Sequence, residues 1–387
     1  MKKRILFVHD HIFAVDQDLN YFSEGKITDS VFGRYKKIGR NIKVICRSQK
    51  KENFSNLDEI TDPDVSFYPV KGIDFKRIFL FNFFDNFFKI LKNVRNSDFV
   101  VLRLPSFLGI FVFFLLMVLK KKYAVEFVGH PKEAIVSTGQ VGVVKRIFAE
   151  IFSYFNKIAV RKSVGTIYVT KERLQSEYPC PGISGVASNV ILNIDKKYKR
   201  NYIKKNASIV IGMIGSFKNS YKGIDIAIAT IAQLRDKGIK CELRILGTGD
   251  KKKYIELARN ISVDEYVFFD GVRASGREVY NWLDSLDIYV QPSRTEGLPR
   301  ALIEAMSRAL PCISSNAGGM PELLEEQYVF CSENIEEFTA KISPFLMDEN
   351  IRMEAGLKNF RKSFEYDDSY LKIKREIFWS EISKVIK

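Results

Sequence analysis

The sequence predicts an α/β protein with two doubly wound, Rossmann-like domains that face each other across a cleft. Three observations support this fold class. The chain has 387 residues, which is too many for one ordinary hydrophobic core. Apolar residues make up 46% of it, as expected of a packed globular protein. Short apolar runs alternate with helical patterns in both halves, which is typical of parallel sheets covered by helices.

Each half of the chain holds six candidate strands, which are short apolar runs between polar or glycine-containing segments. Those of the first half are Ile5–Val8, Ile42–Cys46, Val65–Pro69, Phe99–Leu102, Tyr123–Val128 and Thr166–Val169. Those of the second half are Ile209–Ile214, Glu242–Leu246, Val267–Phe269, Ile288–Val290, Cys312–Ser314 and Tyr328–Cys331. Open parallel sheets bind ligands beyond the carboxyl ends of their strands, so two facing sheets predict a binding cleft between the domains.

A polar stretch rich in lysine and asparagine, Asp195–Ser208, is the expected linker between the domains. We therefore expect an N-terminal domain over residues 1–200 and a C-terminal domain over residues 201–367. A helix at about 368–387 is expected to pack back on the N-terminal domain.

The net charge of +15 is concentrated in the first half. Residues 1–195 hold 30 basic and 19 acidic side chains, a net charge of +11, and the remaining residues hold 31 and 27, a net charge of +4. A basic half suits a nucleic acid or an anionic membrane surface as partner. We find no nucleic-acid-binding module in the sequence and predict no nucleic acid partner.

The sequence predicts neither a cofactor nor a metal site. The five cysteines are widely spaced and odd in number, which argues for a reducing compartment, and the apolar run at Ile5–Val8 is too short for a signal peptide, so we expect a cytoplasmic protein. With only three histidines, a histidine-rich metal site is not expected. Gly247-Thr248-Gly249 lacks the third glycine of a dinucleotide fingerprint, because residue 252 is lysine, and we reject an NAD site there.

Residues 75–92 predict an amphipathic helix with a wide aromatic face. Its apolar residues recur at helical spacing and are Leu80, Phe84, Phe87, Phe88 and Leu91, widened by Phe79, Phe83 and Ile90. Its polar residues are expected on the opposite face and are Asn82, Asp85, Asn86 and Lys89. Flanking lysines and arginines suit a helix that binds the inner face of the cell membrane, whereas a wide apolar stripe equally suits a helix of the core.

The segment Glu296–Ala305 carries the most chemical information. It follows a predicted strand, and Pro299 fits the start of a helix because proline fixes φ and lacks an N–H group. Free N–H groups near Gly297 and Leu298, at the positive end of that helix, suit a phosphate or an oxyanion. Glu296 and Glu304 are separated by roughly 12 Å in a helix, so they suit two ends of one long ligand.

Two other strand ends have a similar character. The segment Ser314–Leu323 combines a strand, a glycine turn and a proline at a helix start. The segment Gly212–Gly223 ends the first strand of the second half and places Lys222 just before a helix. An ammonium group there can neutralise a diphosphate leaving group.

The order and spacing of these motifs from Gly212 to Glu322 resemble the donor domain of glycosyltransferase family 4, whose members have the GT-B fold. Each motif alone is weak, but the whole series is specific. The first half more loosely resembles the acceptor domain of polysaccharide-building members of the family. The segments that carry this second resemblance are Tyr21–Lys26, Arg103–Pro105, Glu126–Pro131 and Tyr168–Thr170.

The resemblance implies a retaining transfer of a sugar from a nucleotide-diphosphate sugar, without a bound metal, to a saccharide or a polyprenyl-diphosphate-linked acceptor in surface polysaccharide biosynthesis. The implied catalytic residues are His130, Lys222 and Glu296. The implied donor-binding residues are Gly215, Ser216, Lys218, Lys222, Gly271, Val272, Glu296, Gly297, Leu298 and Glu304. Lys222 would hold the diphosphate, and Glu304 the ribose hydroxyls. The family usually has an arginine where this sequence has Ser216, and Lys218 is the candidate replacement.

The first predicted strand of the chain ends at the cleft. The residues expected on this acceptor side are His9, Asp10, His11, Gly25 and Arg103. Two other functions stay open at this point. A nucleotide-sugar epimerase would use the same fold, and a non-catalytic nucleotide-sugar-binding protein would explain Ser216 as the mark of a decayed donor site.

Overall fold

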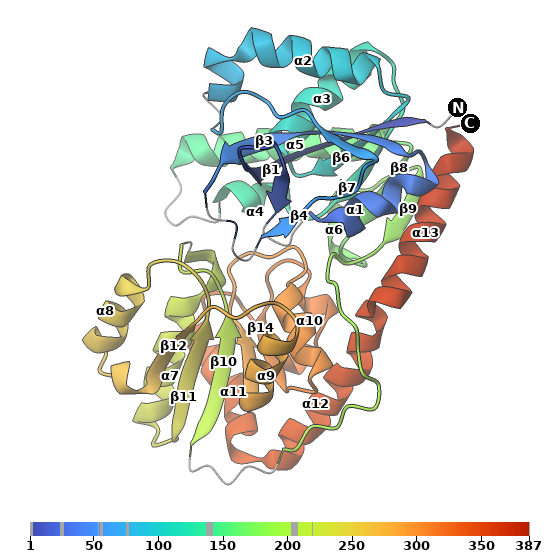
Figure 1. Ribbon diagram of the computed structural model, residues 1–387. Coiled ribbons are helices and arrows are strands. Elements are labelled where there is room, and N and C mark those ends of the chain that lie inside the picture. The colour runs from blue at the N-terminus through green and yellow to red at the C-terminus, as the bar shows by residue number, and fades with distance from the viewer. Residues whose placement is uncertain are drawn as a thin grey trace.

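The computed structural model describes residues 3–23, 27–52, 54, 57–74, 77–136, 142–202, 208–218 and 220–386. These residues form two parallel sheets, one from each half of the chain, with helices on both faces of each sheet (Figure 1). The predicted fold class is therefore confirmed. No helix in these ranges combines the length and the apolar character needed to cross a membrane.

The parallel strands of the first sheet lie in the order β5 (Val65–Phe67), β3 (Asn41–Lys50), β1 (Arg4–Val15), β6 (Phe99–Leu104), β7 (Tyr123–Phe127), β8 (Gly165–Tyr168) and β9 (Ile183–Val186). The end of β1 also forms an antiparallel pair with β2 (Tyr21–Ser23), which pairs in turn with β4 (Asp58–Glu59). Strand order reverses between β3 and β6 around β1, and such a switch point is where open sheets bind ligands.

Alternate residues of the first sheet point to opposite layers of helices. Leu6, Val100 and Leu102 pack against α2 (Phe83–Arg95), α3 (Phe107–Val118) and α5 (Val143–Lys162). Ile5, Phe7 and Val101 pack on the other face. That face is covered by α1 (Asp29–Gly33), the 3₁₀ helix η1 (Arg34–Lys37) and α13 (Asp368–Val385). Two short helices, α4 (Pro131–Val136) and α6 (Arg173–Glu177), follow β7 and β8.

The second sheet is parallel throughout, in the order β12 (Val267–Gly271), β11 (Cys241–Leu246), β10 (Ile209–Ile214), β13 (Ile288–Gln291), β14 (Cys312–Ser315) and β15 (Val329–Phe330). One face packs against α7 (Ile224–Asp236), α8 (Lys252–Asn260) and α11 (Ile335–Met347). The other packs against α9 (Arg277–Ser285) and α10 (Arg300–Ser307). The helix α12 (Glu349–Ser363) contacts α10 and α11.

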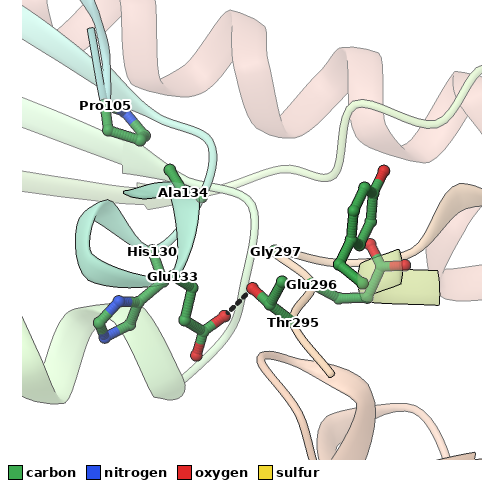
Figure 2. A pocket seen from close by; sticks show the side chains of 9 residues that line it. Pro105, His130, Glu133, Ala134, Thr295, Glu296 and Gly297 are labelled. Carbon is green, nitrogen blue, oxygen red and sulfur yellow. Dashed lines mark hydrogen bonds between the residues drawn. The ribbon is translucent and has the colours of Figure 1, made fainter. Parts of the chain in front are cut away.

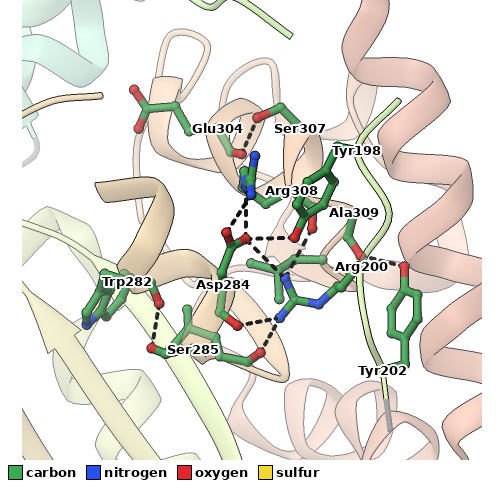
Figure 3. A network of polar contacts seen from close by, with 12 residues as sticks. Tyr198, Arg200, Tyr202, Trp282, Asp284, Ser285, Glu304, Ser307, Arg308 and Ala309 are labelled. Atoms are coloured by element: carbon green, nitrogen blue, oxygen red, sulfur yellow. Dashed lines mark hydrogen bonds and ion pairs between the residues drawn. The ribbon is translucent and has the colours of Figure 1, made fainter. Parts of the chain in front are cut away.

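The described part of the predicted linker, 195–202 and Ser208, contains no helix or strand. It is held against the second half by polar contacts around Asp284 (Figure 3). The Tyr198 hydroxyl donates a hydrogen bond to Asp284 at 2.8 Å, and Arg308 forms an ion pair with the same carboxylate. Arg200 donates to the backbone carbonyl of Arg308 at 3.1 Å. The domain limits at residues 200 and 367 stay predictions.

After α12 the chain returns to the first half through α13 (Figure 1). Trp379 of α13 is fully buried there, with its ring centroid 5.1 Å from that of Tyr35 in η1. Arg375 donates a hydrogen bond to the backbone carbonyl of Ser188. The first half is therefore completed by a helix that follows the second half in the sequence.

The predicted helix at 75–92 is present. Residues 75 and 76 lie outside the described residues, Arg77–Phe81 form the π-helix η2, and α2 follows. Asn86, which we expected opposite the aromatic face, is buried and forms hydrogen bonds with the backbone of Lys71 and Ile78. Phe84 and Phe88, which we expected on the aromatic face, are exposed. The burial of Asn86 could not be predicted, because an asparagine that satisfies backbone groups cannot be recognised from helical spacing.

Candidate active site

A buried ion pair lies where β10 and β13 end. Lys222 closes the 3₁₀ helix η3 (Ser220–Lys222), and its Nζ donates a hydrogen bond to Oε1 of Glu296, which precedes α10. Burial lowers the pKa of Lys222, but the charge of Glu296 and the hydrogen bond to it more than offset this effect, so the pKa lies above its ordinary value. Lys222 is therefore a cation at neutral pH.

A chain of buried side chains orients Glu296. The Tyr289 hydroxyl donates to Gln291 Oε1 at 2.7 Å, and Gln291 Nε2 donates to Ser293 Oγ at 2.7 Å. The Ser293 hydroxyl then donates to Glu296 Oε1 at 3.0 Å. This relay of hydrogen bonds starts inside the strand β13 and ends at the carboxylate, so the position of Glu296 is fixed by the sheet.

Two glycines allow the backbone around the ion pair to pack closely. Gly223, directly after Lys222, has a φ of 68°, and a Cβ atom there would lie 1.9 Å from the carbonyl oxygen of Pro292. A Cβ atom on Gly297 would lie 2.8 Å from the carbonyl oxygen of Val128, which belongs to the first half. A side chain at either position would separate the loops that form the site.

A cavity of about 270 Å³ lies between the two halves (Figure 2). Its wall from the first half consists of Pro105, Gly129, His130, Glu133 and Ala134. Its wall from the second half consists of Tyr221, Thr295, Glu296 and Gly297. The Thr295 hydroxyl donates a hydrogen bond to Glu133 Oε2 at 2.5 Å and joins the two walls (Figure 2).

His130 lies in the cavity wall directly before α4. Its Nε2 donates to Glu177 Oε2 at 2.7 Å, and Glu177 also accepts from Arg173 at 3.0 Å. The Nδ1 atom of His130 is buried and has no hydrogen-bond partner among the described residues. Because Nε2 carries the proton in the neutral ring, Nδ1 is available as an acceptor.

Glu304 lies on α10, away from the residues that line the cavity. Burial raises its pKa to about 6, with a smaller opposing effect from Arg300. Glu304 and Glu296 both act on buried Tyr289, whose pKa is raised mainly by burial and further by these two carboxylates.

The other predicted donor-binding residues lie on loops at the same sheet edge. A Cβ atom on Gly215 would lie 3.1 Å from the side chain of Lys222. The Ser216 hydroxyl donates to the carbonyl of Thr248 at 3.3 Å and accepts from the amide of Lys218, whose side chain is exposed. Leu298 precedes the N-cap residue Pro299 of α10. Gly271 and the exposed Val272 lie at the end of the edge strand β12.

The predicted acceptor-side residues do not line the cavity in the described structure. Asp10 accepts hydrogen bonds from the amides of Phe107 and Leu108 and so caps α3. His9 donates to the carbonyl of Arg103 at 3.1 Å, and His11 contacts Ser23 Oγ at 3.0 Å. Arg103 is buried in an ion pair with Glu126 at 2.5 Å, and Gly25 lies outside the described residues. Their acceptor role stays a prediction.

A second contact between the halves was not predicted from the sequence. The carboxylate of Glu322 accepts hydrogen bonds from the amides of Lys171, Glu172 and Arg173, at 2.5, 3.1 and 2.7 Å. These amides belong to the first residue of α6 and the two residues before it, and the same helix carries Glu177. A carboxylate at such a position stabilises the helix start. The only sequence signal was the position of Glu322 in the glycine- and proline-containing motif.

Comparison with known proteins decides the family. A family model for group 1 glycosyl transferases matches residues 208–348, the part that holds Lys222, Glu296 and Glu304. Protein CapJ of Staphylococcus aureus is 30% identical to the chain over 99% of its length and 96% of CapJ. The chain belongs to the group 1 glycosyltransferases. The predicted family and enzyme class are thereby confirmed for this glycosyltransferase.

Two further proteins extend the comparison. The putative colanic acid biosynthesis glycosyltransferase WcaL of Escherichia coli K12 is 28% identical to the glycosyltransferase over 40% of this chain and 41% of WcaL. The structure of HepE from Anabaena, solved with UDP and glucose, matches 99% of each chain with a TM-score of 0.64 and 14% identity. This structural likeness confirms the two-domain GT-B architecture.

Among the described residues, no group of three or more histidine, cysteine, aspartate or glutamate side chains is arranged to hold a metal ion. The charged groups at the site include the Lys222–Glu296 ion pair, Glu133 of the cavity wall and the Glu304 carboxyl group. They provide a positive charge, a hydrogen-bond acceptor and the free amides before α10, which together suit an anionic ligand with hydroxyl groups.

Proposed function

We propose that the glycosyltransferase transfers a sugar, with retention of its anomeric configuration, from a nucleotide-diphosphate sugar to a saccharide or a polyprenyl-diphosphate-linked saccharide in surface polysaccharide biosynthesis. The observation that carries this proposal is the partly buried Lys222–Glu296 pair, whose carboxylate lines the cavity between the two halves together with His130. Glu296 and His130 line this cavity, which is large enough for a sugar, and the Lys222 ammonium group is bonded to the Glu296 carboxylate.

Each donor group has a proposed contact. Lys222 and the amides of Gly297 and Leu298 bind the diphosphate, because charge-assisted hydrogen bonds and a helix start favour phosphate oxygens. Glu304 accepts hydrogen bonds from the ribose hydroxyls, and Gly271 and Val272 lie beside the base. Glu296 and His130, which line the cavity, bind hydroxyls of the donor sugar. Gly215, Ser216 and Lys218 complete the diphosphate loop.

The reaction we propose takes place on one face of the sugar. The bond between the anomeric carbon and the phosphate oxygen breaks, and the acceptor hydroxyl oxygen bonds to the same face of that carbon. The hydroxyl proton passes to the departing phosphate oxygen. Lys222 stabilises the negative charge that develops there, and the two halves hold both substrates in place.

The role in polysaccharide biosynthesis draws on the names of relatives. WcaL is named for colanic acid biosynthesis, and HepE was solved with UDP and glucose. UDP-sugars are therefore the first donors to test, and the acceptor side is the surface of the first half near α4.

A screen of nucleotide sugars tests the proposal. We expect one donor to raise the Tm by several degrees, because a ligand that binds only the folded protein stabilises it by mass action. The enzyme is then incubated with that donor and saccharide acceptors. NMR of the product should show that the transferred sugar keeps the anomeric configuration that it has in the donor. A changed sugar without acceptor would indicate an epimerase, and stabilisation without any turnover would indicate a binding protein; either result would overturn the proposal.

A further inference from the structure

Much of the exposed apolar surface lies on one layer of helices. The helices α2, α3 and α5 cover the same face of the first sheet, with α3 in contact with both neighbours. We call these three helices, together with η2, the outer helix layer; α2 and α3 lie together at the top of Figure 1. Its exposed apolar side chains are Leu80, Phe81, Phe84, Phe88, Phe114, Met117, Val118, Val143, Val144, Ile147, Phe148, Ile151 and Tyr154.

The helix α2 buries polar as well as apolar side chains and exposes aromatic ones. Asn86 is 3% exposed and uses its amide to satisfy backbone groups of Lys71 and Ile78. Phe84 is 73% exposed and Phe88 is 62% exposed on the outer side of the same helix. In water alone, these two exposed phenylalanines leave apolar area hydrated. The outward phenylalanines therefore point to an apolar environment outside the protein.

The neighbouring helices continue this surface. All twelve residues of α3 lack a charged or polar side chain, although Phe114, Met117 and Val118 are exposed. The first turns of α5 are more exposed still, and Val144 is 83% exposed. Val144, Ile147 and Ile151 recur at helical spacing and form an outward apolar stripe. Contiguous apolar patches of this kind mark interaction sites.

Basic side chains accompany the apolar ones. The helix α5 carries five basic residues and one acidic residue, Glu150, which is paired with Lys132 at 2.7 Å. Lys89, Lys92 and Arg95 lie on α2, and three consecutive lysines begin at Lys120 just after α3. This charge distribution selects an anionic partner. Among apolar partners, a bilayer with acidic headgroups combines both properties over a wide, shallow surface.

We propose that the outer helix layer docks on an anionic lipid surface. Phe84, Phe88 and Ile147 enter the boundary between headgroups and acyl chains, and the basic side chains contact lipid phosphates. The docking does not depend on the proposed glycosyl transfer. It does place the cavity close to the lipid, because α5 contacts α4, and α4 carries Glu133 of the cavity wall. A lipid-linked acceptor could reach the cavity along this edge, and that consequence rests on the proposed function.

Flotation of the full chain with vesicles, in the absence of any nucleotide sugar, tests the docking. We expect binding to phosphatidylcholine vesicles that contain phosphatidylglycerol, and weak binding to phosphatidylcholine alone. The affinity of the triple variant F84S/F88S/I147S for the acidic vesicles should be lower by roughly tenfold or more, because apolar insertion and headgroup attraction act together. As a matched control, I373S/I377S changes two exposed isoleucines of α13 outside the layer and should bind like the unchanged protein.

A second variant tests the electrostatic part. K145E/R146E alters only exposed side chains of α5. It should weaken binding to the acidic vesicles about as much as added salt weakens the binding of the unchanged protein. Near-ultraviolet circular dichroism shows whether each variant is folded. Undiminished flotation of both folded variants would overturn the proposal. Absence of flotation by the unchanged protein, or its sedimentation as a dimer that the triple variant separates, would also overturn it and assign the layer to another partner.

Discussion

Lys222 and Glu296 form an ion pair with each other in the structure. A diphosphate that binds Lys222 must share the cation with the Glu296 carboxylate. The carboxylate is held by Ser293 at 3.0 Å, so it can keep one hydrogen bond while it contacts the sugar. The pair therefore keeps a buried cation stable until the substrate arrives.

Replacement of Lys222 tests this role. We expect Lys222→Met to lower kcat/KM by about 10²–10³, because a single charged group that stabilises a leaving group contributes on this order. Steady-state kinetics with the donor identified by the screen provide the measurement. Lys237→Met, which changes an exposed lysine after α7, is the matched control and should leave the kinetics unchanged. Near-normal activity of folded Lys222→Met would remove Lys222 from the site.

Glu304 predicts a pH dependence of donor binding. Its pKa of about 6 is above the ordinary value because of burial, and only the ionised carboxylate accepts two hydroxyl hydrogen bonds. Donor affinity should therefore fall as the pH drops below about 6. Calorimetric titration of the donor between acidic and neutral pH measures this effect. Glu304→Gln should bind more weakly at neutral pH and lose this pH dependence; an unchanged pH profile in the variant would contradict the assignment.

The same carboxyl group affects stability. The native state holds the Glu304 proton up to a higher pH than the unfolded chain, so stability is lost as the pH rises from about 4.5 to about 6. Above this window the ionised carboxylate costs about 2 kcal/mol at most. We expect the free energy of unfolding of Glu304→Gln to exceed that of the unchanged protein at pH 7, and the difference to vanish at acidic pH.

The residues of the site were predictable to different extents. Lys222, Glu296 and Gly297 were recognisable because each belongs to a motif with a strand end and a helix start. Their pairing was not, because Lys222 and Glu296 are 74 positions apart and meet through tertiary packing. Gln291 and Ser293, which orient Glu296, look like ordinary turn residues in the sequence. Asp10 faces a helix start rather than the cavity, and no local pattern indicates this.

At the scale of elements, α6 depends on the opposite half of the molecule. Its N-terminal amides are satisfied by Glu322, and its last residue, Glu177, holds the ring of His130. A change at the contact between the halves is thereby linked to the wall of the cavity. The helix has five residues, too few to be stable on its own, so this cap matters more than it would on a long helix.

Removal of the cap tests the link. We expect Glu322→Ala to lower the free energy of unfolding by about 1–2 kcal/mol, the usual range for loss of a capping side chain. Hydrogen exchange of the Lys171–Arg173 amides should accelerate in the variant. Glu325→Ala, which removes an exposed partner of Lys358, should change neither quantity. Unchanged exchange at Lys171–Arg173 would mean that the amides have other partners.

Most elements could be predicted because hydrophobic periodicity sets strands and helices locally. All twelve predicted strands are present, and all but Ile209–Ile214 have shifted ends. The strand β9 was missed because Ile183–Val186 contains a serine and a glycine and pairs only at the edge of the sheet. The short strands β2 and β4 were missed because two or three residues carry no periodicity. The sequence left open which face of α2 points inward, because its orientation is set by hydrogen bonds of Asn86 to distant backbone groups.

At the scale of the whole molecule, α13 connects the two halves. Trp379 of this helix is the largest fully buried side chain among the described residues. We expect Trp379→Ala to lower the free energy of unfolding by about 3–5 kcal/mol, because it leaves a large cavity in the core. Chemical denaturation measures the change. Tyr370→Ala alters a half-exposed residue of the same helix and serves as control; equal effects of the two would show that Trp379 is not part of the core.

The return of α13 also sets an order of events during synthesis. The nascent first half lacks a helix that is translated only after the entire second half, so Tyr35 and its neighbours stay uncovered until α13 has been made. The core of the first half is therefore completed last. A ribosome that stalls after the second half would release a chain whose first half is a target for chaperones and proteases.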